Sequence, residues 1–396
     1  MIKSLSEIGP KKSLIPGSHA FLTSYVQKNR RLYLGQMQEL NFISKTADGS
    51  TIIPNLFRRT TDILTELVFS GPPTIDPTAT GRGHEYLQGI WERSIQALTR
   101  ATANALRYGH GVIVSDPFDP QAMVSVEPDY LYLVEDTFGT ASACVHVSFR
   151  PDILYHPGAG GTDGVVDVFK YDYRTGDSLH EVYAYEGLTL GNLLNSQPLP
   201  RRTGPQHVTF AFNKDRLSQY DAMKVHVGEA GNALTALSRT ISRNSAPHMY
   251  GPPNMLEKDS NGNYEINVAG MFLPIEDGDE RPGYLQWDSS IEALSWDYEV
   301  SFRLAITQAG LASPIFAPDI RSGTILTGPA LKLLLLNTFS LTERIKQALS
   351  EAFRGCVQIA LGNRTADIPS VPDFAITWPF EDALQFKNPE GGSLND

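Results

Sequence analysis

Two hydrophobic patterns alternate along the chain and together predict an α+β protein. Apolar residues spaced three and four apart are typical of helices, which we expect over 17–44, before Gly71, and over 85–108, 221–246, 288–311 and 327–361. Between these helices, short runs rich in β-branched and aromatic residues predict antiparallel strands: VIVSD, YLYLVED, SACVHVSF, VVDVFKYDY and HEVYAYE. A last strand, DFAITWPF, is expected near the C-terminus.

The helix predicted over 221–246 carries a narrow apolar seam. Its members recur in steps of four and three, which is the spacing of helix packing: Met223, Val227, Ala230, Leu234, Leu237 and Ile241. Gly228 and Gly231 lie inside this helix at a propensity cost of about 1 kcal/mol each. Two such glycines indicate that another backbone approaches closely; a weak surface helix is the alternative.

A small β-rich insert is expected over 247–287. The residues KDSNG predict a hairpin turn within it, and a second turn is strongly acidic: Glu276, Asp277, Asp279, Glu280 and Arg281. The acidic turn is either a solvated loop or a surface that attracts a basic partner. The helix over 288–311 then starts with the capping-box pattern Ser289-x-x-Glu292 and ends at Gly310.

A long loop over 312–326 interrupts two helices with proline and glycine, and a connection of this length is usually functional or disordered. Its polar residues include Asp319, Arg321, Ser322 and Thr324. Gly328 and Pro329 start the next helix, which would extend over 327–361 for roughly 50 Å.

Composition and charge narrow the class of protein. The chain has 396 residues, is 41% hydrophobic and 19% charged, and has a formal net charge of −11. These values fit an ordered globular chain and argue against a basic surface that coats nucleic acid. The two cysteines, Cys144 and Cys356, are far apart in sequence and are expected to be buried thiols. No signal peptide or membrane-spanning run is recognisable, so we expect a soluble intracellular protein.

Catalytic and metal-binding patterns are weak, and we expect no enzyme activity, cofactor or metal. The glycine-rich stretch 158–164, GAGGTDG, lacks the phosphate-binding and dinucleotide-binding spacings. The HE pairs at His84 and His180 lack the second histidine of a zinc helix. Three aspartates beside prolines, Asp116, Asp119 and Asp129, have the context of turn residues and not of Mg²⁺ ligands.

The order of these parts resembles that of tailed-phage portal proteins, which also occur in phage-derived gene transfer particles. The resemblance covers nearly the full length and is carried by three segments in the right order: IIPNLFRRTTDILTELVFSGPP, ALRYGHGVIVSD and SGTILTGPALKLLLLNTFSLTERIKQALSEAF. None is an invariant signature, so their combination carries the resemblance.

The resemblance implies a portal-like fold in a ring of twelve subunits around a DNA channel at one capsid vertex. The parts would be a mixed α/β wing (1–220), stem helices (221–246 and 288–311), a clip (247–287), a tunnel loop (312–326), a long wing helix (327–361) and a C-terminal strand and tail (362–396) with a small or absent crown. The tunnel-loop residues would face DNA, the acidic turn would face a partner, and Gly228, Gly231, Leu234, Leu237 and Ile241 would pack the stem.

The partners implied by the resemblance are the large terminase subunit, a head–tail adaptor, the major capsid protein or scaffold, and double-stranded DNA bound without sequence specificity. The protein would belong to the virion and assemble in the host cytoplasm, without contact to a membrane. Two other hypotheses remain open. The first is a hydrolase-like α/β enzyme with a helical lid and the 158–164 loop at its substrate site. The second is another head-assembly protein, such as an adaptor.

Overall fold

The computed structural model describes most of the helices and strands of the chain. The described residues are 4–40, 52–71, 73–77, 82–119, 121–135, 140–149, 164–187, 189–202, 204–213, 215–244, 248–251, 257–258, 264–265, 272–274, 283–285, 291–312, 328–363 and 374–378.

The chain divides into two compact units. Unit 1 comprises Met1–Gln36, Phe57–Ala222 and Ala309–Asp396, and unit 2 comprises Met37–Leu56 and Met223–Gln308. The predicted stem and clip segments fall mainly in unit 2. Residues 37–56, which the sequence analysis included in the N-terminal body, group with them.

A five-stranded antiparallel meander is the largest sheet of unit 1. Its strands lie in sequence order: β4 (Leu131–Glu135), β5 (Ala141–Phe149), β6 (Gly164–Asp172), β7 (Ser178–Glu186) and β8 (Thr189–Leu199). The predicted hairpins in this region are confirmed, since each strand pairs antiparallel with the next. β8 was not predicted, because its glycine, asparagines and proline have low strand propensity.

A second sheet of unit 1 packs against one face of this meander. It has the order β3-β2-β9, with β2 at Gly111–Ser115, β3 at Met123–Val126 and β9 at His207–Phe210. Its Val112 and Val114 cluster with buried residues of the meander such as Cys144 and Tyr171. The opposite face of the meander is covered by the N-terminal segment through Ile8 and Leu14. The meander is therefore buried on both faces over its central strands.

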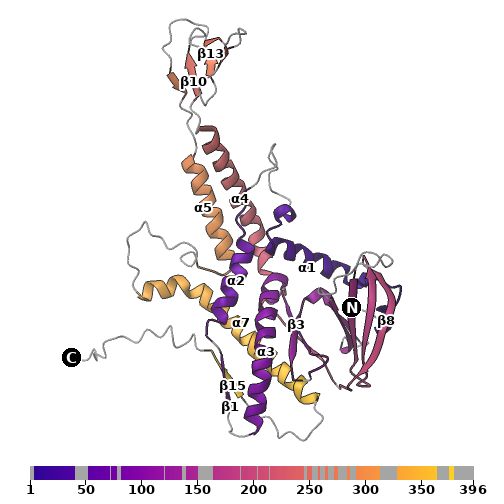
Figure 1. Cartoon of the computed structure of the whole chain (residues 1–396). Helices are drawn as coiled ribbons and strands as arrows, with labels where there is room; N and C mark the ends of the chain where they lie inside the picture. Colours follow the sequence, from indigo (N-terminus) through magenta and orange to yellow (C-terminus); the bar gives the residue numbers. More distant parts are fainter. Residues whose placement is uncertain are drawn as a thin grey trace, which may run out of the picture. The chain divides into compact units, whose positions relative to one another are not determined.

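Helices complete unit 1 (Figure 1). They are α1 (Ala20–Tyr33), α2 (Leu56–Val68), α3 (Arg82–Tyr108) and α7 (Gly328–Gly362), with short 3₁₀ turns at Leu5–Glu7, Gly17–His19 and Pro128–Tyr130. α3 packs on β2 and β3, and α7 contacts α3 and β9. The predicted C-terminal strand, β15 (Phe374–Thr377), pairs with β1 (Thr74–Pro77). The prediction of one very long helix from about residue 327 is confirmed.

The prediction that the first helix continues to residue 44 is wrong. α1 ends at Tyr33 and is followed by Gly35, whose φ of 84° lies in the left-handed region. The N–H of Gln36 donates to Arg31 O at 2.8 Å and the N–H of Gly35 donates to Leu32 O at 3.0 Å. This pair of hydrogen bonds is the Schellman motif that ends a helix. Gly35 therefore terminates α1, although the spacing of apolar residues continues beyond it and predicted a longer helix.

A close junction joins the end of α3 to the start of α4 (Gln219–Asn244). Gly109 has a φ of 86°, and a Cβ built there would lie 2.0 Å from the carbonyl oxygen of Arg216. Ser218 caps α4 by accepting a hydrogen bond from the N–H of Tyr220 at 3.0 Å, and its hydroxyl donates to Arg107 O. The hydroxyl of Tyr25 accepts from the N–H of Ser218 at 2.9 Å. α1, α3 and the first turn of α4 thus share one hydrogen-bonded cluster.

Unit 2 contains the rest of α4, the helix α5 (Ile291–Gln308), the 3₁₀ turn Met37–Glu39 and a small β-module between the two helices in sequence. The module pairs β10 (His248–Gly251) with β13 (Phe272–Pro274) and β14 (Gly283–Leu285). β11 (Glu257–Lys258) and β12 (Tyr264–Glu265) pair antiparallel on either side of the predicted turn, so that hairpin is confirmed. In the chain order, α4 precedes this module and α5 follows it (Figure 1).

We predict that Gly109→Ala destabilises the protein strongly. The added methyl group would meet the Arg216 carbonyl, and alanine would also carry the left-handed φ, so the expected loss is about 3 kcal/mol or more. Gly204→Ala is the matched control, because Gly204 has a φ of 80° but open space around its Cβ position. It should lose only about 1–2 kcal/mol. If urea unfolding gives the same loss in the free energy of unfolding for both variants, the close approach at Gly109 does not contribute to stability.

Candidate functional site

The candidate site is the helical part of unit 2, where the sequence predicts packing between subunits. The seam of α4 is buried at its start and becomes exposed toward its end. Met223, Val227 and Ala230 are fully buried, and Gly228 is buried as well. Leu234 and Leu237 are half-buried, while Ile241 keeps 50% of its surface exposed. A single copy of the chain therefore covers only the first half of the seam.

Gly231 is the place where another part of the chain comes closest to α4. A Cβ at this position would lie 2.8 Å from Cγ1 of Ile53, which belongs to the same unit. The hydroxyl of Thr235, one turn further along α4, accepts a hydrogen bond from the N–H of Ile52 at 3.0 Å. The same hydroxyl lies 2.7 Å from the carbonyl oxygen of Gly231, to which it can donate. The extended residues 52–53 therefore lie along α4 and occupy the space that the glycine leaves.

Large apolar side chains remain exposed on both helices of unit 2. Val225 and Ile241 of α4 are 53% and 50% exposed, and Trp296 and Leu304 of α5 are 68% and 41% exposed. Ile52, beside α4, is 46% exposed. Scattered exposed apolar residues are common, but a tryptophan in the middle of a helix is a typical anchor of a protein interface.

The two helices of unit 2 carry opposite net charge. From Met223 onward, α4 contains three basic residues and one acidic residue: Lys224, Arg239, Arg243 and Glu229. α5 reverses this ratio with Glu292, Asp297, Glu299 and Arg303. Within α5, Arg303 pairs with Glu299 one turn away. Opposite net charge on the two helices favours contact between an α4 surface and an α5 surface, because complementary potentials attract.

Residues 158–163 of the glycine-rich stretch lie outside the described part of the chain, and so do two further groups of sequence-predicted residues. These are the tunnel-loop residues Asp319, Arg321, Ser322 and Thr324, and the acidic turn Glu276, Asp277, Asp279, Glu280 and Arg281. The chain order places the acidic turn between β13 and β14 of the module, and the loop between α5 and α7.

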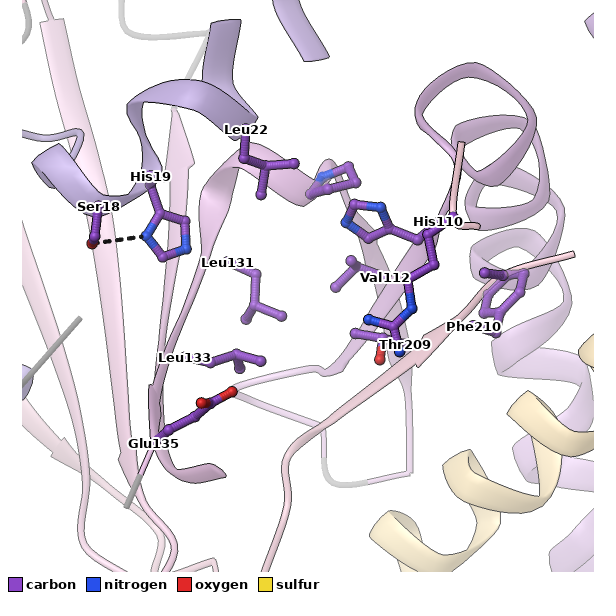
Figure 2. A pocket seen from close by; sticks show the side chains of 13 residues that line it. Ser18, His19, Leu22, His110, Val112, Leu131, Leu133, Glu135, Thr209 and Phe210 are labelled. Carbon is purple, nitrogen blue, oxygen red and sulfur yellow. Dashed lines mark hydrogen bonds between the residues drawn. The ribbon is translucent and has the colours of Figure 1, made fainter. Parts of the chain in front are cut away.

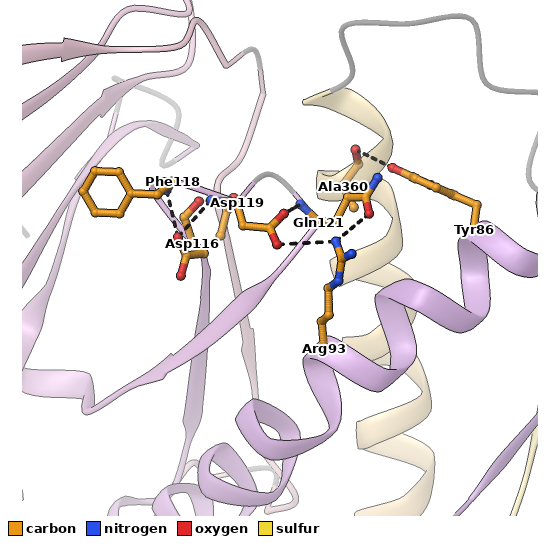
Figure 3. Close-up of polar contacts among 8 residues, drawn as sticks. Tyr86, Arg93, Asp116, Phe118, Asp119, Gln121 and Ala360 are labelled. Atoms are coloured by element: carbon orange, nitrogen blue, oxygen red, sulfur yellow. Dashed lines mark hydrogen bonds and ion pairs between the residues drawn. The ribbon is translucent and has the colours of Figure 1, made fainter.

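The aspartates that were considered as metal ligands have local structural roles. Asp116 accepts hydrogen bonds from the backbone N–H groups of Phe118 and Asp119 at 2.8 and 3.0 Å, as Figure 3 shows. Asp119 accepts from the N–H of Gln121 at 2.9 Å, and Arg93 of α3 donates to the Gln121 side chain at 2.7 Å. This is the turn-forming use of aspartate that the neighbouring prolines suggested.

Asp129 is the third of these aspartates and lies in a buried ion pair. It is completely buried, and its Oδ1 is 3.5 Å from Nη2 of Arg30. Burial raises the pKa of the Asp129 carboxyl, and the Arg30 guanidinium opposes that rise. Across the residues that the structure describes, no group of three or more His, Cys, Asp or Glu side chains could hold a metal ion.

Three side chains that could take part in catalysis, His180, Cys144 and Cys356, are occupied or buried. His180 has its Nε2 2.7 Å from Asp167 Oδ1 and its Nδ1 2.9 Å from Gln197 Nε2, so both ring nitrogens already have partners. Burial raises the pKa of the Cys144 and Cys356 thiols to about 12, which keeps both out of the nucleophilic thiolate form. The expectation that both thiols are buried is confirmed.

An open cavity of about 400 Å³ lies in unit 1 between the N-terminal end of α1 and the two sheets (Figure 2). His19 and His110 line it together with Arg216 and apolar residues such as Leu131. Burial lowers the pKa of His19 to about 4, and burial and Arg216 lower that of His110. Both rings are therefore neutral at ordinary pH. Sequence reasoning missed this cavity because its residues come from five separate segments.

Comparison with known proteins leaves the family open. No family model matches the chain, and no curated protein matches it. Among the described helices, none is both long and apolar enough to cross a membrane.

We predict that Gly231→Leu weakens the packing of residues 52–53 on α4. Overpacking costs about 1–3 kcal/mol and outweighs the gain of roughly 0.8 kcal/mol in helix propensity. Adding Ile53→Ala should recover part of the loss, because it empties the space that the leucine needs. Gly89→Leu in α3 is the matched control, since nothing lies near that Cβ position, and it should not destabilise. Unfolding in urea measures the parent, the two single variants Gly231→Leu and Ile53→Ala, the double variant and the Gly89→Leu control; additive effects of the 231 and 53 changes would contradict the contact.

Proposed function

We propose that this protein is a portal-like ring protein that forms a conduit for double-stranded DNA at a capsid vertex. The observation that carries the proposal is the pair of unit 2 helices, which expose large apolar side chains and carry opposite net charge in a single copy. Neighbouring copies around a ring would cover these side chains, with α4 of one copy against α5 of the next.

The arrangement of the chain supports the same proposal. A β-rich body precedes a helix, a small β-module, a returning helix, a long connection and a 35-residue helix. This is the order of parts on which the resemblance to portal proteins rests. A heterologous contact that repeats by rotation closes into a ring, whereas a two-fold contact stops at a dimer.

The tunnel loop over 312–326 would be the part that meets DNA. Only one of its polar side chains, Arg321, is basic, and each phosphate contact adds affinity through counterion release. A loop with so little positive charge would let DNA slide. The motor ATPase, the head–tail adaptor and the capsid protein or scaffold are the partners we propose, and the acidic turn over 276–281 would face the motor or adaptor.

The enzyme alternative was predicted to use the 158–164 loop, of which residues 158–163 lie outside the described residues, so its support here is the cavity beside His19 and His110. The cavity offers neutral imidazoles and one guanidinium, but the two cysteines and His180 are not available for catalysis. We therefore favour the conduit over an enzyme. An adaptor would share the ring but would not bind the packaging motor, and a binding assay with that motor separates the two.

We predict that Trp296→Ser weakens assembly and that Trp296→Phe does not. Full burial of a large apolar side chain contributes about 1.5–3 kcal/mol, so each intersubunit contact should weaken roughly 10- to 100-fold. Sedimentation at several protein concentrations measures the change. Equal assembly by the serine and phenylalanine variants would exclude Trp296 from the interface.

We predict that deletion of residues 316–324, closed with glycines, leaves the ring and the particle intact but abolishes DNA retention. The deleted residues would contact the channel and not the core. Particle yield and packaged DNA are the two measurements. A loss of folding would instead show that the segment belongs to the core of unit 1.

A further inference from the structure

The outer edge of β8 is paired over only a short length. On its inner side β8 pairs with β7 along its length. On its outer side the N-terminal segment forms one rung: the N–H of Lys11 donates to Leu190 O at 2.7 Å, and the N–H of Leu190 donates to Lys12 O at 2.9 Å. Ser13 and Thr189 form the adjoining antiparallel bridge. The edge therefore accepts an added strand at its first residues.

The rung stops because the N-terminal segment turns away from β8. Lys11 has a φ of 61°, in the left-handed region, and the N–H of Lys12 donates to Gly9 O at 3.1 Å. Beyond this turn Ile8 is fully buried in the core of the meander. From Gly191 onward, no other described residue donates a backbone hydrogen bond to the outer edge of β8 or accepts one from it.

The open part of β8 is bulged but lacks the charged side chains that commonly protect an edge strand. Asn192 to Pro198 are all exposed, with Leu193 at 44% and Leu194 at 57%. No residue from Thr189 to Pro200 is charged, in a chain that is 19% charged. Natural proteins commonly block such edges with lysine or other charges, since unpaired N–H and C=O groups are a template for another strand. Pro198 removes one donor near the end, so the usable template covers Gly191–Gln197.

We propose that Gly191–Gln197 binds an extended, uncharged segment of a partner protein as a sixth strand of the meander (β8 in Figure 1). Seven residues span about 20 Å, the length of an ordinary strand. Main-chain hydrogen bonds would supply affinity, and contacts with Leu193 and Leu194 would favour apolar residues in the partner. The proposal is independent of ring formation.

The shape of β8 favours a flexible segment as its partner and disfavours the β8 edge of a second copy. The pairing of β8 with β7 shifts register between Val182 and Tyr183 and again between Tyr183 and Tyr185, so β8 is bulged along the open part. Bulges bend and twist a strand. An extended segment can follow such a bend, whereas the edge of a second folded copy would have to match it with a rigid strand.

The experiment uses the full chain and a capped peptide of about nine residues in which valine or threonine alternates with asparagine. Hydrogen exchange at 191–197 is followed with and without the peptide. Bound peptide should slow exchange there by roughly tenfold or more, because opening of the added strand then precedes exchange. The same peptide with alternate amides N-methylated is the control and should leave exchange unchanged, since it lacks the donors.

Variants of the edge complete the test. Asn192→Lys combined with Ser196→Lys should weaken peptide binding at least tenfold, by placing charge on the edge. Gln347→Lys combined with Gln358→Lys adds the same charge at exposed positions of α7 and should bind normally. Failure of the peptide to slow exchange would overturn the proposal. Slow exchange at 191–197 in the dilute chain without peptide would also overturn it, because the edge would then already be covered. Exchange that slows as the protein concentration rises would overturn it as well, because the edge would then pair with a second copy.

Discussion

The close junction between α3 and α4 is the constraint on which the rest of unit 1 depends. Gly109 lets the backbone at Arg216 come nearer than any side chain would permit, and Ser218 and Tyr25 hold that approach with hydrogen bonds. Three helices and the start of β2 meet within this cluster. The junction also determines where α4 begins, and α4 is the helix that continues from unit 1 into unit 2.

In unit 2, packing within the chain leaves part of the apolar surface of the helices exposed. The packing of residues 52–53 at Gly231 covers one side of α4, but the later part of the seam and Trp296 of α5 stay in contact with water. Full burial of a large apolar side chain contributes about 1.5–3 kcal/mol, and these half-exposed side chains forgo part of it. The proposed assembly with neighbouring copies would recover that free energy. The opposite charge of the two helices would then set which surfaces meet.

Periodicity predicted the long elements of the fold well, because six helical patterns and six strand patterns are local properties of the sequence. It failed where one residue overrode the pattern, as Gly35 did at the end of α1, and where a strand lacked β-forming residues, as β8 did. The glycines of α4 predicted the close approach of another backbone; at Gly231 the nearest atoms belong to the Ile53 side chain of the same chain, which the sequence could not show. The cavity beside His19 depends on tertiary contacts and had no local signal.

The central claim is that copies of this chain close into a ring around a channel. Native mass spectrometry of the purified full chain, with electron microscopy of the same sample, tests it most directly. The account predicts one dominant closed assembly whose mass is a multiple of the 43.6 kDa chain, seen as rings with a central hole. Monomers or two-fold dimers at micromolar concentration, without larger assemblies, would contradict it.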